Sequence, residues 1–115
     1  MELSAEGFDA LVTEELDDLA DEIVEGLDNI VFVTEDMSPD GDTELLGLYE
    51  GVALTERDHY GFGELPDRIV LFRLPLLGIC DTEADLRQQI HVTLVHEIAH
   101  FYGLTDDELH DLGWA

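Results

Sequence analysis

Two histidines and a glutamate near the end of the chain have the spacing of a metal site. His96 and His100 are four residues apart, and Glu97 directly follows the first of them. Residues four apart lie on one face of a helix, so both imidazoles can bind the same ion. Neutral imidazoles suit Zn²⁺, and a glutamate beside them can act as a general base toward water. The spacing predicts a zinc site with His96 and His100 as ligands and Glu97 as the base.

A catalytic zinc site usually has a third protein ligand, and Asp106 is the preferred candidate. Gly103 follows His100 by three residues and permits a sharp turn, after which Asp106 would return beneath the metal. An acidic residue in the first turn of a helix is also favoured by the helix dipole alone, without any metal. Asp107 and His110 are the competing ligands, since His110 lies one helical turn beyond Asp106. HExxH alone is a short motif, and the addition of Gly103 and Asp106 makes it far more specific.

The other histidines and the tyrosines are given no role in the site. His91 is five residues before the first histidine of the motif and therefore points well away from it on a helix. His59 has no partner in sequence and is interpreted as a surface residue. A tyrosine hydroxyl can stabilise an oxyanion, but no spacing selects one of Tyr49, Tyr60 and Tyr102. The predicted chemistry therefore rests on the C-terminal motif.

The helix that must carry the motif has clear signals at both ends. Asp81 or Thr82 can cap its start, and Gly103 can end it after about Tyr102. Its apolar stripe consists of Leu86, Ile90, Leu94, Val95, Ile98 and Ala99. The run from Thr105 to Glu108 has the form of a capping box. It predicts a last short helix that carries Leu109, Leu112 and Trp114.

The N-terminal half predicts one amphipathic helix followed by strands. Ser4 can cap a helix of about five turns, broken near Leu19-Ala20 and ended by Gly26, whose apolar positions are Phe8, Leu11, Val12, Leu16, Leu19 and Ile23. Residues 30–34 and 68–74 are β-branched or apolar runs typical of strands, the second closed by Pro75. Residues 45–55 predict a twisted strand or a hairpin around Tyr49. Residues 38–42 and 56–67 are predicted loops.

Three stretches resemble a known family. The run from His96 to Gly113 closely resembles the C-terminal signature of the small zincin-like metallopeptidase family, once classed as a domain of unknown function. Residues 46–51 and 66–73 are similar to that family as well, so the resemblance covers nearly the whole chain. It implies an α+β protein with the minimal zincin fold. In that fold a small three- to four-stranded sheet packs on two main helices, the second of which bears the motif, and a short C-terminal helix follows.

The end of the motif is also similar to the metzincin arrangement, with an aspartate in place of the usual third histidine, as in the small snapalysin-type proteases. Metzincins have a methionine turn after the motif. Here Met1 and Met37 both precede it. The resemblance therefore implies a metal site of metzincin type whose floor is built differently.

The net charge of the chain indicates which partners and which salt conditions suit it. Four arginines and no lysines against 29 acidic residues give a net charge of −25. Molar salt shortens the Debye length to about 3 Å and removes most of the resulting repulsion, so we expect adaptation to a salt-rich cytoplasm. Binding to cationic partners is the alternative, although the carboxylates are spread along the chain. Four scattered arginines exclude nucleic acid as a partner.

Length and composition predict one domain over residues 1–115. Hydrophobic residues make up 45% of the chain, which allows a modest core. No apolar run is long enough to span a membrane, and the acidic start lacks the features of a secretory signal, so we expect a cytoplasmic protein. The only cysteine, Cys80, is interpreted as a small buried hydrophobe. We also expect a monomer.

Two classes of function fit these observations. In the first, the protein is a zinc-dependent peptidase that acts on peptide or protein substrates. In the second, it is a zinc-stabilised interaction module without turnover, since 115 residues leave little room for a cleft with two walls. A peptidase that acts only with a partner is a third possibility.

Overall fold

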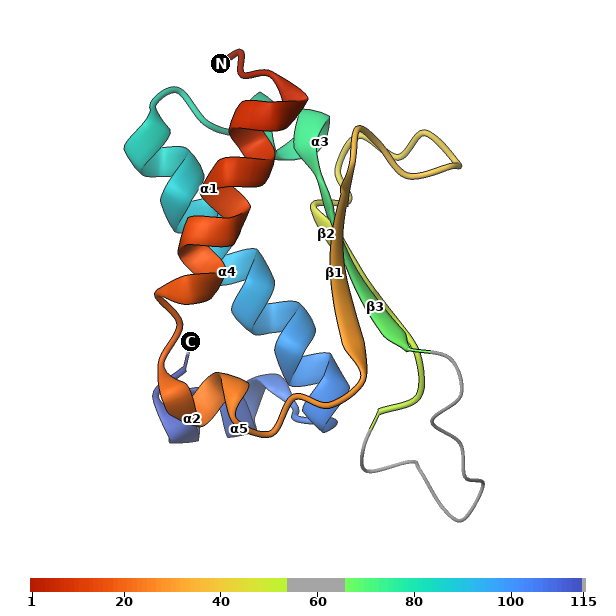
Figure 1. The fold of residues 1–115 in the computed structure, drawn as a ribbon, viewed down its shortest axis with the longest axis vertical. Helices are drawn as coiled ribbons and strands as arrows, with labels where there is room; N and C mark the ends of the chain where they lie inside the picture. The colour runs from red at the N-terminus through yellow and green to blue at the C-terminus, as the bar shows by residue number, and fades with distance from the viewer. Residues whose placement is uncertain (54–65, 115) are drawn as a thin grey trace.

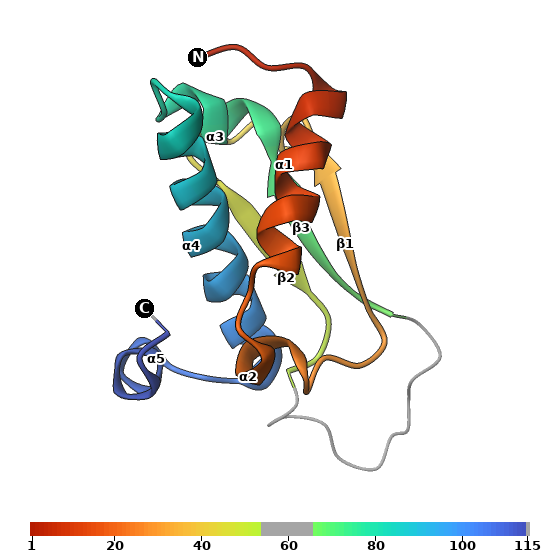
Figure 2. The same ribbon diagram turned by 60° about the vertical axis from the view of Figure 1, so that its left-hand side comes forward.

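The protein is described by a computed structural model that places residues 1–53 and 66–114. In chain order its elements are α1 (Ala5–Asp17), α2 (Asp21–Val24), β1 (Ile30–Glu35), β2 (Gly47–Glu50), β3 (Asp67–Phe72), α3 (Arg73–Gly78), α4 (Glu83–Tyr102) and α5 (Asp106–Leu112). The two long helices, α1 and α4, lie on the same side of the sheet (Figures 1 and 2). This α+β arrangement confirms the expected fold class.

The sheet of the described residues has three strands in the order β1-β3-β2. β1 runs parallel to β3, with Ile30 opposite Asp67 and Glu35 opposite Phe72. β2 runs antiparallel to β3, with Gly47 opposite Leu71. Within residues 45–53 the predicted strand or hairpin is one short strand. β3 is therefore the central strand, and β2 forms the edge that packs against α4.

The N-terminal helix is interrupted where the sequence predicted a break. Ser4 caps α1 by accepting a hydrogen bond from the backbone N–H of Gly7. α1 ends at Asp17, and the chain turns through Leu19 and Ala20 before α2 begins. Leu19 is nevertheless buried, at 5% exposure. The apolar residues after the break, Leu19 and Ile23, are thus still buried in the core, although α1 has already ended.

The core lies between the helices and the helix-facing side of the sheet, in two adjoining clusters. The first cluster joins α1, the start of α4 and the end of β3; its buried residues are Phe8, Leu11, Val12, Leu71, Leu76, Leu77, Cys80, Leu86, Ile90 and Leu94. The second cluster surrounds the later turns of α4 and consists of Leu19, Ile23, Ile69, Val95, Ile98, Ala99 and Leu109. Cys80 is buried, as predicted. Among the described residues no helix has the length and apolarity that a membrane span requires.

The end of the third strand differs from the prediction. Arg73 and Leu74 do not extend the strand but begin the short helix α3, and Pro75 is its third residue. The first N–H groups of a helix have no partner within the helix, so proline fits there without loss of a hydrogen bond. The Arg73 side chain bonds Asp36 and the carbonyl of Leu3. These contacts hold the start of α3 against the end of β1.

Three of the four arginines join separate elements. Arg87 on α4 contacts Glu14 and Glu15 on α1, besides Glu83 one turn before it. Arg68 pairs with Glu50 across β3 and β2, and Arg73 pairs with Asp36 as described. Most of these side chains are partly exposed, so each pair contributes at most about 1 kcal/mol. These three arginines thus lie where they offset acidic groups on neighbouring elements.

A close approach between β2 and α4 requires the glycine at position 47. A β-carbon at Gly47 would lie 2.6 Å from Thr93 Cγ2 and 3.2 Å from the carbonyl oxygen of Val70. Gly47→Ala should therefore lower the free energy of unfolding by about 1–3 kcal/mol, as overpacking does elsewhere. Urea unfolding in molar salt measures this change. Gly78→Ala is the matched control, because no atom lies within 4 Å of its added carbon. Equal stability of both variants would contradict the close packing.

Candidate metal centre

The motif lies on α4, whose two ends are fixed by the predicted signals. Of the two candidate caps, Thr82 is the N-cap, and its side chain accepts a hydrogen bond from the backbone N–H of Asp85. At the other end Gly103 adopts the left-handed conformation, with φ 76° and ψ 26°. A residue with a side chain is strained in that conformation, so glycine ends the helix one turn after the motif.

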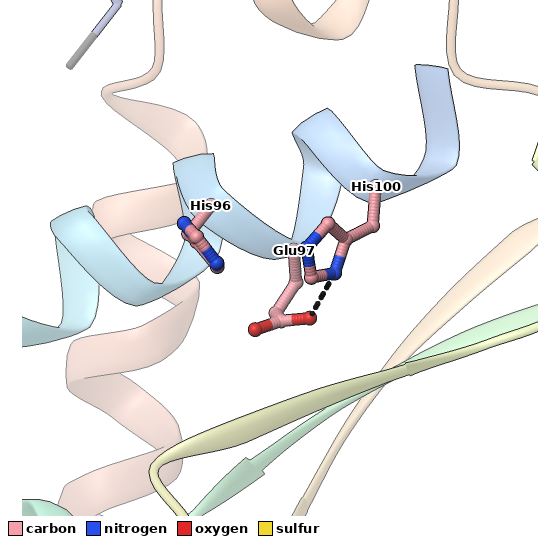
Figure 3. Close-up of side chains that lie close together, drawn as sticks. All are labelled: His96, Glu97 and His100. Carbon is pink, nitrogen blue, oxygen red and sulfur yellow. Dashed lines mark hydrogen bonds and ion pairs between the residues drawn. The ribbon is translucent and has the colours of Figure 1, made fainter. Parts of the chain in front are cut away.

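Three side chains of α4 converge on the side of the helix that faces β2 (Figure 3). They are His96, Glu97 and His100, and one ligand atom from each lies within 4.8 Å of the other two. The two imidazole rings are 4.8 Å apart between centroids and inclined by 67°. His96 and His100 are exposed, whereas Glu97 is buried at 7% exposure. The site therefore combines two accessible imidazoles with one shielded carboxylate.

The carboxylate of Glu97 is paired with one of these rings. Nδ1 of His100 lies 3.0 Å from Glu97 Oε1. With its hydrogen on Nδ1, the ring donates to the carboxylate and keeps the lone pair on Nε2. Metal-binding histidines commonly have such a carboxylate partner, which orients the ring and selects the tautomer. The pair holds His100 in a form that can bind a metal.

The proposed third ligand lies on the next helix. Asp106 is the first residue of α5, and its side chain is exposed. The chain reaches it through the turn at Gly103, where Leu104 N–H donates to the carbonyl of Ala99. Asp106 is not among the three residues whose ligand atoms converge. Its role as a ligand stays a prediction, as do those of its competitors Asp107 and His110, which are also exposed on α5.

α5 itself forms as the capping box predicted. Thr105 accepts a hydrogen bond from the backbone N–H of Glu108, and the Glu108 carboxylate accepts one from the backbone N–H of Thr105. Leu109 is buried in the core, which attaches α5 to the later turns of α4. Asp106 is thereby tied to the helix that bears both histidines.

Two of the three tyrosines have hydroxyls already engaged in the fold. Tyr102 donates to the carbonyl of Ile23 at 2.7 Å, and burial raises the pKa of this phenol. Tyr49 donates to Asp67 Oδ2 at 2.6 Å. Tyr60, like His59, lies outside the described residues. Neither Tyr49 nor Tyr102 is therefore a ready donor to an oxyanion in this structure.

Asp67 was not recognised from the sequence. It was assigned to a loop, but it is the first residue of β3 and is buried at 8% exposure. Its backbone N–H donates to the carbonyl of Asn29. A single aspartate beside a proline carries no sequence signal of burial. Only the pairing of β3 with β1 and β2 shows that this carboxylate is enclosed.

The donor set of the site fits zinc. Imidazoles are typical ligands of Zn²⁺, and a carboxylate often lies beside them in zinc sites. Ca²⁺ and Mg²⁺ instead prefer oxygen ligands. The exposure of both rings leaves room for an additional protein ligand and for water. Catalytic zinc sites have three protein ligands and one open position, and the two histidines would supply two of them.

Comparisons with known proteins found a family match and a similar solved structure. A family model described as "Zincin-like metallopeptidase" matches residues 27–114. Among solved structures, the chain is similar to a conserved hypothetical protein from T. thermophilus. The two share 22% sequence identity and a TM-score of 0.57, with 96% of this chain and 97% of that chain covered. At this identity the likeness concerns the fold alone. No match was found among curated proteins.

Proposed function

We propose, because the chain belongs to the zincin-like metallopeptidase family, that it is a zinc-dependent peptidase that hydrolyses peptide bonds at the site on α4. The observation that carries this proposal is the convergence of His96, Glu97 and His100 on one helix face. The family implies zinc binding, and the donor set fits that metal. His96, His100 and Asp106 would hold the ion.

The acid–base work of hydrolysis falls to Glu97. Bound zinc would supply a Lewis acid that polarises the scissile carbonyl and makes a water more acidic. Glu97 would take the proton from the attacking water and later deliver it to the leaving amine. Its burial restricts the movement of the carboxylate. With its hydrogen on Nδ1, His100 donates to the same carboxylate and helps to orient it.

A peptide substrate can be held by the edge strand nearest the motif. β2 is the edge of the described sheet that packs against α4. Extended peptides commonly bind by adding a strand to such an edge, through hydrogen bonds between main chains. In this mode of binding most of the affinity comes from the main chain of the substrate, and its side chains need few contacts. A 115-residue protein can thus hold a peptide without a second wall to its cleft.

The direct test is peptide cleavage by the zinc-loaded protein. The protein, purified in molar salt without a histidine tag, is incubated with a diverse peptide library, and products are identified by mass spectrometry. We expect cleavage that a chelator stops and that added zinc restores. Zinc-loaded protein that cleaves no peptide under these conditions would contradict the proposal and favour the interaction module instead.

A further inference from the structure

β2 packs against the face of α4 that carries Glu97. Thr93, Glu97 and Phe101 are spaced four residues apart and therefore lie on one face of the helix. All three are buried, at 6%, 7% and 0% exposure. The backbone of β2 approaches the first of them at Gly47, where an added β-carbon would lie 2.6 Å from Thr93. The ring of Tyr49 contacts Phe101, edge to face, with 6.2 Å between centroids.

The two contacts lie on either side of the general base. Glu97 is one helical turn after Thr93 and one turn before Phe101, so a strand that contacts both passes beside Glu97. Figure 3 shows the Glu97 carboxylate on the side of the helix that faces the sheet. The distance between the edge strand and the base therefore depends on these two contacts.

The Tyr49 contact has a second anchor in the sheet. Tyr49 lies opposite Ile69 in the register of β2 and β3, and its hydroxyl reaches Oδ2 of the buried Asp67 at 2.6 Å. A hydrogen bond to a carboxylate is stronger than one between neutral groups. The chain leaves β2 close to the same carboxylate, because a β-carbon at Gly51 would lie 2.6 Å from Asp67 Oδ1. Tyr49 is thus held at its hydroxyl by Asp67 on β3, and its ring packs on Phe101 of α4.

We propose that Tyr49 is a positioning residue, which through Asp67 and Phe101 sets where the edge strand β2 lies relative to Glu97. This inference rests on the proposed function, in which β2 binds the peptide and Glu97 acts on its scissile bond. A strand that is held in place before the substrate arrives presents the peptide at a defined distance from the base. Tyr49 acts on the reaction only through the strand.

The test compares Tyr49→Phe with Leu48→Ala. Tyr49→Phe keeps the ring on Phe101 and removes the hydroxyl that bonds Asp67. Leu48 is the next residue in the same strand, but it lies opposite Val70, on the other face of the sheet, and is 37% exposed. Both substitutions therefore change β2, and only the first acts on the proposed anchor.

Hydrogen exchange measures the position of the strand without any metal or substrate. In Tyr49→Phe we expect the β2 amides to exchange about fivefold faster or more, since one hydrogen bond to a charged group is lost, with the β1 amides unchanged. Leu48→Ala should leave the β2 amides within about twofold of wild type. Unchanged β2 exchange in Tyr49→Phe would overturn the proposal. So would equal acceleration in β1 and β2, because that result means global destabilisation.

Peptide kinetics measure the consequence for the reaction. Binding of a peptide must order a strand that Asp67 no longer holds in place, so we expect KM to rise about fivefold in Tyr49→Phe while kcat stays near wild type. A local rise in exchange with unchanged KM would overturn the part of the proposal that concerns the substrate. Wild-type protein that cleaves nothing would count against the peptidase, and hydrogen exchange alone would then decide the role of Tyr49. If Tyr49→Phe does not fold, Asp67→Asn gives the same comparison, because it weakens the bond by removing its charge.

Discussion

Glu97→Gln should abolish most peptide hydrolysis while the protein keeps its zinc. The amide has the size and shape of the carboxylate but cannot take a proton from water. General acid–base catalysis typically contributes about 10²- to 10⁴-fold, and we expect a loss of kcat in that range. The measurement is kcat for a peptide found in the library screen, together with the zinc content of the same preparation. Both histidines remain, and the amide oxygen of glutamine can still accept a hydrogen bond from His100 Nδ1, so the zinc content should stay near that of wild type.

The control for this variant is Glu83→Gln. It makes the same chemical change on the same helix, at the first residue of α4, roughly 21 Å of helix away from Glu97. Glu83 is exposed and pairs with Arg87 on the same helix, so kcat should remain near wild type. A Glu97→Gln protein that hydrolyses peptides at the wild-type rate would show that another group is the base. Loss of zinc along with activity would instead indicate that the Glu97 carboxylate is a ligand or is needed to orient His100.

The parts of the structure that were predictable depend on signals close together in sequence. Thr82 caps the start of α4 and Gly103 caps its end, because a hydroxyl cap and a left-handed glycine each act within one turn of the helix. The convergence of the two histidines follows from the helical repeat alone. α5 follows from the capping box formed by Thr105 and Glu108. Local chemistry therefore located both helices of the candidate site.

The parts that were missed depend on contacts between distant segments. Pro75 was taken as the stop after a strand, but the bonds of Arg73 to Asp36 and Leu3 join β1 and the N-terminus to the first turn of a helix. Asp67 was placed in a loop, and only the neighbouring strands enclose it. The choice of Tyr49 among three tyrosines needs the register of β2 and β3. None of these pairings leaves a periodic pattern in the sequence.

The expected salt adaptation bears on how each measurement is made. With three of its four arginines paired to carboxylates on neighbouring elements, the chain has few cations left to offset its acidic surface. At low ionic strength the remaining repulsion opposes the compact state. Variants that remove a buried contact should then unfold before their effect on the site can be measured. Molar salt, which screens exposed charges and leaves buried contacts intact, separates the two effects.

Wild-type protein purified in molar salt should contain about one zinc per chain, and His100→Ala should lose it. His100 supplies one of the two imidazoles, and its removal also takes the partner away from the buried Glu97 carboxylate. Changes to groups that only support a ligand typically lower metal affinity about 10- to 100-fold, so removal of a ligand itself should exceed that range. Metal analysis of each purified protein measures the content, and competition with a chelator measures the affinity.

The same measurement decides among the candidates on α5. We expect Asp106→Ala to weaken zinc binding markedly, while Asp107→Ala and His110→Ala serve as matched controls on the same helix and remain near wild type. All three side chains are exposed, so their removal should leave the fold intact. If His110→Ala releases the metal and Asp106→Ala does not, the site has three histidines and its third ligand lies a full turn further along α5. Folded wild-type protein that binds no zinc even after metal addition would remove the basis for a peptidase. The helix motif would then serve only the packing between α4 and β2, where Glu97 is already buried.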